Sequence, residues 1–356
     1  MSRHGLLALA ALLLLVGCAS EPLEMKLDGP RAGAVSLFPP PETQETPRYR
    51  FVGELRGETN FKPKDGGRGR GAGRRLLALI TGMDEAVVDP TVLVRPQTGV
   101  VDSAGRVLVT DVGRPGVFVF DEANGSFQLW NKAAGSMSFE SPVGIAIGRD
   151  GEVLVADADL GRVFRLAPDG SPRGEFGAGL LTRPTGIARD PARGRVFVAD
   201  TQAHDIKVFD DDGRHLATWG RNGEGPGEFN FPSHLSFGSG MLVVADSMNA
   251  RVQGLDSEGK AVLRVGQRGL YVGNLVRPKG VATDDEGNLY VVESMHDTLL
   301  VFDGTGRLLM PLGGTDGSEA GRFHLPAGVW LDARNRVYVA DMFNARVAIF
   351  QFLGGN

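Results

Sequence analysis

The chain has 356 residues, including 51 glycines and 20 prolines, and 42% of its residues are hydrophobic. So many glycines beside this apolar share favour short strands joined by turns over a helical or disordered chain. The formal net charge of −5 lacks the basic balance of nucleic-acid-binding proteins, so no nucleic-acid partner is expected.

The N-terminal residues have the pattern of an export signal that ends at a lipid attachment site. Arg3 and His4 precede an apolar run over residues 5–16, which is shorter than the roughly 20 residues of a membrane-spanning helix. The run leads into Leu-Val-Gly-Cys, which resembles the bacterial lipobox, and Cys18 is the only cysteine. We therefore predict a signal peptide over residues 1–17 and a lipidated Cys18, with no disulfide within the chain. The alternative is an ordinary secretory peptide.

The residues after Cys18 indicate where the protein lies and how it is attached. Ala19 follows the cysteine, and the absence of Asp there resembles lipoproteins sorted to an outer membrane, facing the periplasm, if the cell has one. Residues 18–48 are polar and proline-rich and show no apolar periodicity. This composition predicts an extended tether between the lipid anchor and the folded part.

Two further segments precede the regular part of the chain. Alternating apolar residues over 49–55 predict a strand. Residues 56–91 contain basic side chains among glycines. This insertion is either a flexible solvated loop or a basic arm that contacts an anionic membrane surface near the anchor.

Six copies of one unit fill residues 92–352. Each copy opens on a proline, and its second apolar run ends on an acidic residue 14 to 16 positions later. The opening residues are Pro96, Pro142, Pro184, Pro232, Pro278 and Pro326. Most copies contain four short runs bounded by glycine turns, which is typical of a four-stranded propeller blade. The sequence therefore predicts an all-β, six-bladed β-propeller of antiparallel blades, expected to be monomeric.

The sixth copy lacks a clear fourth run. We expect the strand at 49–55 to supply it and to become the outer strand of blade six. This pairing would close the ring and remove two exposed sheet edges.

The recurring pattern resembles the NHL repeat family. The nearest matches are Pro142-Val-Gly-Ile-Ala with the acid Asp157, and Val-Ala-Asp341 with Asn344-Ala-Arg346. The resemblance covers about residues 95–352 and implies the propeller fold. NHL propellers include protein-binding and RNA-binding scaffolds and a few enzymes, such as peptidyl-hydroxyglycine amidating lyase, so the resemblance implies no single function.

The repeated residues have structural explanations. The glycine at the third position of the Pro-x-Gly opening allows close backbone packing near the narrow axis. The acid ending the second run can accept hydrogen bonds from the following turn, and an arginine five residues later can pair with it. The expected pairs are Asp157–Arg162, Asp246–Arg251 and Asp341–Arg346. Gly116, Asp205 and Thr298 stand at the arginine position in blades one, three and five.

Candidate site residues gather on one predicted face. In a four-stranded blade, the loop from strand two to three and the loop entering strand one open on the same side. The first kind of loop contains His204 and His296, and His234 and His324 lie near the second kind. Glu293 and Met295 join this candidate binding face because their blade-five loop departs most from the other copies.

Three converging histidines could bind zinc and activate water. The resemblance to amidating lyase implies metal histidines directly after the opening proline. This sequence has no histidine there; the residues are Gln97, Val143, Thr185, Ser233, Lys279 and Ala327. We therefore predict no catalytic residue, metal ligand or cofactor.

These observations predict an exported, membrane-anchored NHL-type propeller that acts as a scaffold for a protein or a surface-exposed ligand. The alternative is an exported metal-dependent lyase or hydrolase with Zn²⁺ or Ca²⁺ at the central channel.

Overall fold

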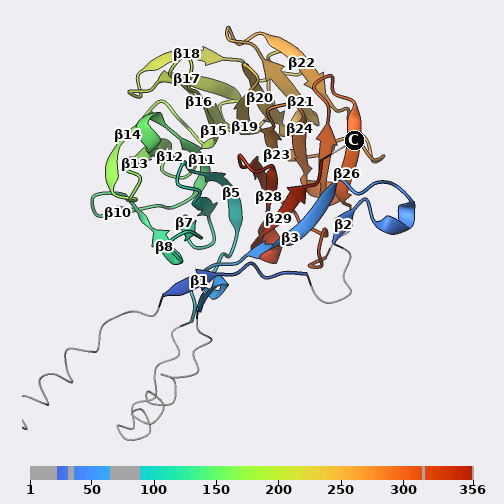
Figure 1. Cartoon of the computed structure of the whole chain (residues 1–356). Coiled ribbons are helices and arrows are strands. Elements are labelled where there is room, and N and C mark those ends of the chain that lie inside the picture. Colours follow the sequence, from blue (N-terminus) through green and yellow to red (C-terminus); the bar gives the residue numbers. More distant parts are fainter. Residues whose placement is uncertain (1–21, 31–35, 65–88, 315–316, 355–356) are drawn as a thin grey trace, which may run out of the picture.

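The computed structural model describes residues 22–30, 36–64, 89–314 and 317–354. Six antiparallel sheets stand around a central axis, and the first strand of each sheet lies next to that axis (Figure 1). The predicted all-β, six-bladed propeller of four-stranded blades is therefore confirmed.

Blades one to five each contain four consecutive strands that pair in chain order. Blade one contains β5 (Pro96–Val101), β6 (Val107–Asp111), β7 (Gly116–Asp121) and β8 (Ser126–Trp130). Blade two contains β11 (Pro142–Ile147), β12 (Val153–Asp157), β13 (Arg162–Leu166) and β14 (Pro172–Phe176). Blade three contains β15 (Pro184–Asp190), β16 (Arg195–Asp200), β17 (Asp205–Asp210) and β18 (His215–Trp219). Blade four contains β19 (Pro232–Gly238), β20 (Met241–Asp246), β21 (Arg251–Leu255) and β22 (Ala261–Val265). Blade five contains β23 (Pro278–Thr283), β24 (Leu289–Glu293), β25 (Thr298–Phe302) and β26 (Leu308–Gly313).

Short elements occupy some of the connections. A two-stranded hairpin, β9 (Lys132–Ala134) with β10 (Met137–Ser138), lies between blades one and two. The short 3-10 turns are η1 (Pro41–Thr43), η2 (Glu58–Asn60), η3 (Arg149–Gly151), η4 (Ser247–Asn249), η5 (Ser294–His296) and η6 (Met342–Asn344).

Blade six combines both ends of the described chain. It contains β27 (Gly328–Leu331), β28 (Arg336–Asp341) and β29 (Arg346–Phe352), followed by β3 (Tyr49–Leu55) and β2 (Leu37–Phe38). In Figure 1 the blue strand β3 lies beside the red strand β29. The expected closure by an N-terminal strand is confirmed, and β2 adds a fifth strand that the sequence did not predict.

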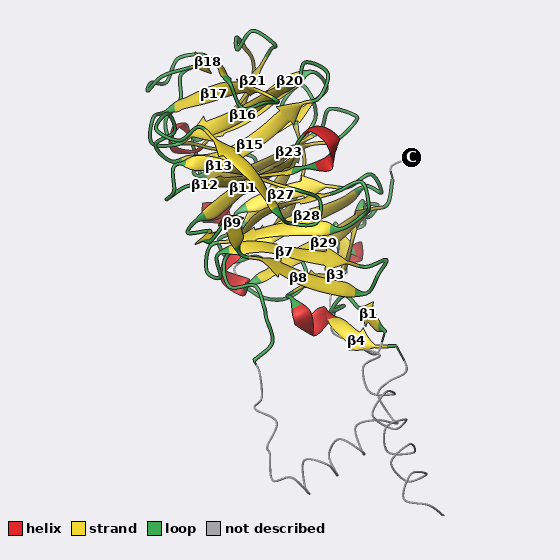
Figure 2. Ribbon diagram, turned by 90° about the vertical axis from the view of Figure 1, so that its left-hand side faces the viewer, coloured by secondary structure: helices red, strands yellow, loops and turns green. Residues whose placement is uncertain are grey.

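Part of the segment expected to be a free tether packs against the propeller. The strand β1 (Leu23–Met25) pairs with β4 (Phe61–Pro63) at the lower end of the body in Figure 2. Phe38 is only 9% exposed, and its ring meets the ring of Phe350 edge-on at 5.7 Å between centroids. A local pattern could not show this packing, because the apolar partners of the segment are distant in the sequence.

Two predicted features lie outside the described residues. They are the signal peptide with Cys18, and residues 65–88 of the basic insertion. Within the described ranges, no helix is long and apolar enough to cross a membrane.

The apolar core is divided among the contacts between blades. The described residues form six clusters, and each cluster joins one pair of neighbouring blades. Between blades one and two, for example, Val117 of β7 packs with Val155 and Phe164, and all three are fully buried. Each such side chain stabilises the ring by roughly 1.5–3 kcal/mol. The ring is therefore held by contacts that no blade makes alone.

The glycine after the opening Pro-x pair lets neighbouring first strands approach closely. A Cβ atom added at Gly186 would lie 2.6 Å from the carbonyl oxygen of Ser233 in the next blade, well inside contact distance. This is the role the sequence suggested for the repeated glycine. Blade four has His234 in place of glycine at that position, so an imidazole ring lies near the axis there.

The two faces of the ring carry different connections. We call one the mouth face: it carries the interblade loops and the turns between strands two and three, and every first strand begins there. The opposite face, called the far face, carries the turns between strands one and two and between strands three and four. His204, His296 and His324 lie in connections of the mouth face, as the strand order requires.

Candidate functional site

A buried carboxylate ends the second strand of every blade and fixes the segment that leads into that blade. Asp157 accepts hydrogen bonds from the backbone N–H groups of Glu140 (2.9 Å) and Ser141 (3.0 Å), just before the opening proline. It also accepts one from Leu160 in the following turn at 3.1 Å, the kind of bond expected from the sequence. All six acids are 0% exposed: Asp111, Asp157, Asp200, Asp246, Glu293 and Asp341.

Glu293, the one glutamate among these acids, makes the same backbone contacts. Its carboxylate accepts the N–H groups of Val276 (2.8 Å), Arg277 (2.9 Å) and Met295 (3.1 Å). In the described part of the chain, no lysine, arginine or histidine forms an ion pair with it. Glu293 therefore makes the structural contacts of the aspartates, but blade five lacks the arginine that pairs with this acid in blades four and six.

Two of the three expected ion pairs are present. Arg251 Nε donates to Asp246 at 2.7 Å, and Arg346 Nε donates to Asp341 at 2.8 Å. Both arginines are buried, at 3% and 2% exposure. Burial raises the pKa of Asp341, and the Arg346 guanidinium opposes this rise. Breaking such a buried pair leaves an uncompensated charge, so both pairs are structural.

The third expected pair, Asp157 with Arg162, is absent. Arg162 Nη1 donates to Glu175 of β14 at 2.6 Å, and its Nε donates to the carbonyl of Leu160 at 3.0 Å. In blades four and six the arginine also bonds to carbonyls of a long interblade loop. Blade two is preceded by the β9–β10 hairpin instead, so Arg162 turns outward to the neighbouring strand.

A cationic pocket lies on the mouth face where the first strands begin. Its volume is about 510 Å³, and Lys279 and Arg277 line it together with Ser233 and Ser294. Burial and the neighbouring Arg277 lower the pKa of Lys279 to about 8. Lys279 Nζ contacts the side-chain oxygen of Gln97 at 3.5 Å, and none of the described carboxylates forms an ion pair with it. The pocket therefore presents positive charge to whatever approaches the mouth face.

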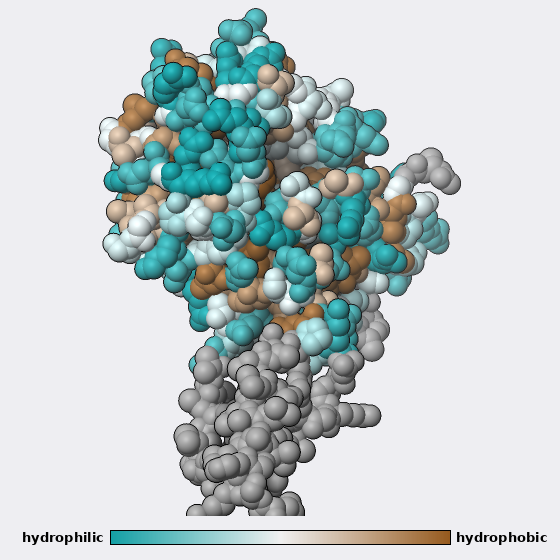
Figure 3. All heavy atoms as spheres, turned by 60° about the vertical axis from the view of Figure 1, so that its left-hand side comes forward, coloured by the Kyte–Doolittle hydropathy of each residue, from teal (hydrophilic) through white to brown (hydrophobic). Residues whose placement is uncertain are grey.

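Exposed apolar side chains surround this pocket. Phe231 is 43% exposed, Met248 46% and Met295 51%, and all three line the pocket. Ten of the fifteen exposed large apolar residues among the described ranges lie in mouth-face connections, four lie in strands, and Leu353 follows the far-face end of β29. In the view of Figure 3, hydrophilic residues cover most of the surface and hydrophobic residues form smaller patches between them.

The predicted histidines lie apart from one another. His204 Nδ1 accepts the backbone N–H of Phe231 at 3.1 Å, and the two rings lie 4.5 Å apart. His324 stacks on Phe343 at 5.3 Å. His296 borders a different pocket in blade five. Within the ranges that the structure describes, no three His, Cys, Asp or Glu side chains are placed to hold a metal ion.

His234 lies inside the central channel, below the mouth face, and is only 6% exposed. Burial, with a smaller effect of Lys279, lowers the pKa of His234 to about 4, so the ring is neutral near pH 7. The channel cavity has a volume of about 280 Å³ and is also lined by Trp330. The buried indole N–H of Trp330 has no hydrogen-bond partner among the described residues. Buried polar groups of this kind are usually satisfied by ordered water.

Comparisons with known proteins agree with this fold. The family DUF5128, described as a 6-bladed beta-propeller, matches residues 190–269. Over 145 residues the chain is 31% identical to Protein brain tumor of Drosophila melanogaster, covering 39% of this chain and 13% of that protein. Over 148 residues it is 33% identical to peptidyl-glycine alpha-amidating monooxygenase A of Xenopus laevis, covering 36% of this chain and 15% of that protein. The chain thus spans less than a fifth of the length of these relatives.

Among solved structures, virginiamycin B lyase from Staphylococcus aureus is similar in fold. The TM-score is 0.54 at 16% identity, and the match covers 73% of this chain and 95% of that structure. Other relatives carry the NHL repeat in their names. The blade pattern, the ring of six sheets and these similarities together identify the chain as a six-bladed β-propeller of the NHL type.

Proposed function

We propose that this protein is an exported, membrane-anchored scaffold that binds a partner protein through its mouth face. The observation that carries the proposal is the concentration of exposed apolar side chains and unpaired cations on that face. Methionine side chains suit such a surface because they are flexible and adapt to varied partners. Several turns of the far face hold an arginine in a local ion pair, such as Arg336 with Asp332 at 2.7 Å.

The anchor is the lipid expected on Cys18, in an outer membrane facing the periplasm if the cell has one. Three residues lie between Cys18 and Pro22, and the carbonyl of Pro22 already accepts a backbone hydrogen bond from Lys64 at 3.2 Å. The four Cα-to-Cα steps from Cys18 to Pro22 span at most roughly 14 Å. The lipid would therefore hold the rim near β1 close to the membrane, with much less reach than a free tether over residues 18–48 would give.

A photo-crosslinking amino acid placed at Met248 in intact cells tests the scaffold proposal. The matched control is the same probe at Glu258, an exposed residue of the same blade on the far face. We expect a discrete crosslinked partner from Met248 that is lost when Met295→Asp is added, and none from Glu258. Equal capture from both positions, or capture that Met295→Asp does not change, would contradict a binding role for the mouth face.

The alternative of a metal-dependent lyase or hydrolase has less support. The matched amidating monooxygenase is named for an enzymatic activity, but the described residues of this chain bring no three potential metal ligands together. Stoichiometric zinc or calcium in the purified protein that is lost in the His234→Ala variant would favour the enzyme over the scaffold.

A further inference from the structure

The loops that lead into blades four and five follow the same backbone path. In the first loop, the N–H of Phe229 donates to the carbonyl of Arg221 at 2.8 Å. In the second, the N–H of Leu275 donates to the carbonyl of Gln267 at 2.9 Å. Phe229 and Leu275 are both fully buried, and both take part in matching parallel bridges. Residues at equal distances from the opening prolines therefore occupy equivalent places in the two loops.

In blade four, an arginine of the chain fills the space beneath this loop. Arg251 Nη1 donates to the carbonyl of Glu224 at 2.6 Å. Its Nη2 donates to the carbonyls of Gly225 at 2.9 Å and Glu228 at 2.8 Å. Its Nε donates to the buried carboxylate of Asp246 at 2.7 Å. One guanidinium thus joins three loop carbonyls to the acid of the blade.

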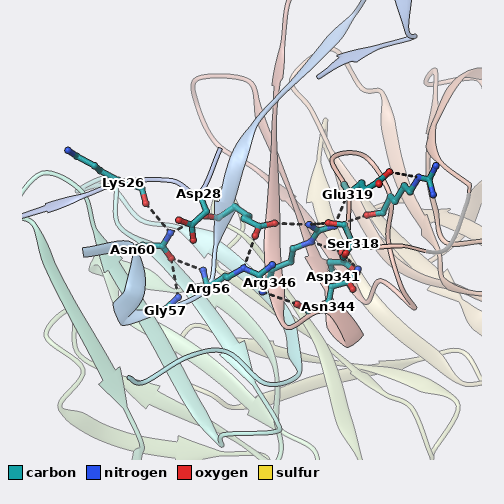
Figure 4. A network of polar contacts seen from close by, with 12 residues as sticks. Lys26, Asp28, Arg56, Gly57, Asn60, Ser318, Glu319, Asp341, Asn344 and Arg346 are labelled. Carbon is teal, nitrogen blue, oxygen red and sulfur yellow. Dashed lines mark hydrogen bonds and ion pairs between the residues drawn. The ribbon is translucent and has the colours of Figure 1, made fainter. Parts of the chain in front are cut away.

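Blade six repeats the arrangement with Arg346, as Figure 4 shows. Arg346 donates to the carbonyls of Ser318 (2.6 Å), Glu319 (3.2 Å) and Arg322 (2.8 Å) and to the carboxylate of Asp341. The planar guanidinium suits this site because its five N–H groups point outward in a fixed fork.

Blade five has the same loop path but no such arginine. Thr298 stands at the equivalent position, and its hydroxyl donates to the carbonyl of His296 at 2.6 Å. The loop carbonyls equivalent to those above belong to Leu270, Tyr271 and Asn274. In the described part of the chain, no side chain donates a hydrogen bond to any of the three.

A cavity of about 420 Å³ lies between this loop and Thr298. Leu270 and Asn274 of the loop line it together with His296 and Asp297, whereas Glu293, the buried acid of the same blade, is not among its lining residues. In blades four and six the chain's own arginine fills the equivalent space and pairs with the buried acid of the blade. The cavity therefore lies where blades four and six hold a guanidinium, and it is lined by acceptor-bearing residues, Leu270, Asn274 and Asp297, with no arginine among its lining residues.

The rim of the cavity is the most exposed apolar segment among the described residues. Leu270 and Tyr271 are each 84% exposed, and Val272 is 72% exposed. Glu224, Gly225 and Pro226 hold these places in the loop of blade four. The loop is nevertheless fixed at its base, since Leu275 is fully buried.

We infer that this blade-five pocket binds the guanidinium of an arginine from the partner protein, and that Leu270, Tyr271 and Val272 pack against apolar residues beside that arginine. The inference rests on the proposed binding role of the mouth face and names the chemistry that the partner presents. Blades one to three also lack the buried arginine pair, but their loops take other paths, such as the β9–β10 hairpin before blade two.

The test is methionine-methyl NMR on the full purified chain, with arginine amide as the probe and lysine amide as the matched control. Met295 borders the blade-five pocket, and Met248 occupies the equivalent place in blade four, where Arg251 already fills the site. We expect arginine amide to shift the Met295 signal saturably and to bind at least ~10-fold more tightly than lysine amide, because only a guanidinium matches the fork of acceptors.

Two variants make the result specific. Thr298→Arg supplies the guanidinium from the chain itself and should abolish the Met295 response. Arg251→Ala opens the equivalent pocket in blade four and should add a saturable Met248 response. Unchanged signals from the other methionine methyl groups would show that each variant is folded. The result from either folded variant alone tests the inference.

Three results would overturn the inference: no saturable Met295 response, an equal response to lysine amide, or a response that Thr298→Arg leaves intact. If any of these occurs while the Met248 photo-probe still captures a partner in cells, the pocket inference fails and the scaffold function stands. A Met295 shift that grows with protein concentration alone would assign the arginine to a second copy of this chain and overturn the partner-protein version.

Discussion

His234 makes the stability of the propeller depend on pH in a direction that can be calculated. Its folded-state pKa is lowered to about 4, against 6.5 for an unperturbed histidine, chiefly because the ring is buried in the channel. Lys279 adds a repulsive charge from β23, and Arg189 also lines the channel. Between pH 6.5 and 4 the unfolded chain therefore binds a proton that the folded chain does not. Stability must fall as pH falls through this window.

The difference of about 2.5 pKa units sets the size of the effect. At about 1.4 kcal/mol per unit, the total loss approaches ~3 kcal/mol below pH 4. Between pH 7 and pH 5 the same linkage gives a loss of about 2 kcal/mol. Replacing His234 by Gln removes the titrating group and should remove this loss.

Urea unfolding of the wild type and the His234→Gln variant at pH 7 and pH 5 measures the effect. The other titrating groups are common to both proteins, so the difference between the two pH-dependent losses isolates His234. We expect the wild type to lose about 2 kcal/mol more than the variant over this interval. Equal losses, or a His234 NMR titration near pH 6.5, would refute the argument that burial keeps this ring neutral.

Three other predictions follow from the structure. Arg346→Met should lower the free energy of unfolding by about 3–5 kcal/mol because it leaves the buried carboxylate of Asp341 without a cation and leaves Glu54 paired with Arg56 alone. Arg307→Met at an exposed pair should cost less than about 1 kcal/mol in the same denaturation assay. Gly186→Ala should lower the free energy of unfolding by about 1–3 kcal/mol because the added carbon crowds Ser233. Gly29→Ala should be nearly neutral, because nothing lies within 4 Å of its added carbon. Equal losses in the two variants would contradict close strand packing. Cys18→Ser should move the protein from the membrane fraction to the soluble fraction on cell fractionation, and retention in membranes would contradict the lipid anchor.

The fold was predictable because its signals are local and repeated. The opening prolines, the period-2 runs and the glycine turns recur six times, and the alternation over Tyr49–Leu55 was enough to predict the closing strand. Phe38 gave no such signal. It is a single apolar residue in a proline-rich segment, and its burial depends on Phe350, which lies far away in the sequence.

The site was less predictable because its properties depend on contacts between loops. The acid ending each second strand was expected to bond to the turn after it, yet Asp157 also holds Glu140 and Ser141, which precede it by a whole hairpin. The exposed Leu-Tyr-Val segment at residues 270–272 was overlooked. Alignment of the interblade loops would have revealed it, because the loop of blade four has Glu-Gly-Pro at the same positions.

The loss of the arginine at one repeated position has different consequences in different blades, and this difference points to function. In blade three, Asp205 stands at that position, and Lys207 from the same strand pairs with Asp205 and not with Asp200, the acid of that blade. In blade five, Thr298 supplies no charge, and no described side chain compensates Glu293 or donates to the three loop carbonyls. Simple loss of a structural pair would be expected to relax the loop onto the gap or fill it with apolar groups. The loop instead keeps the backbone path of blade four and carries three exposed apolar residues above an open cavity, which is the arrangement expected where the missing cation arrives from another molecule.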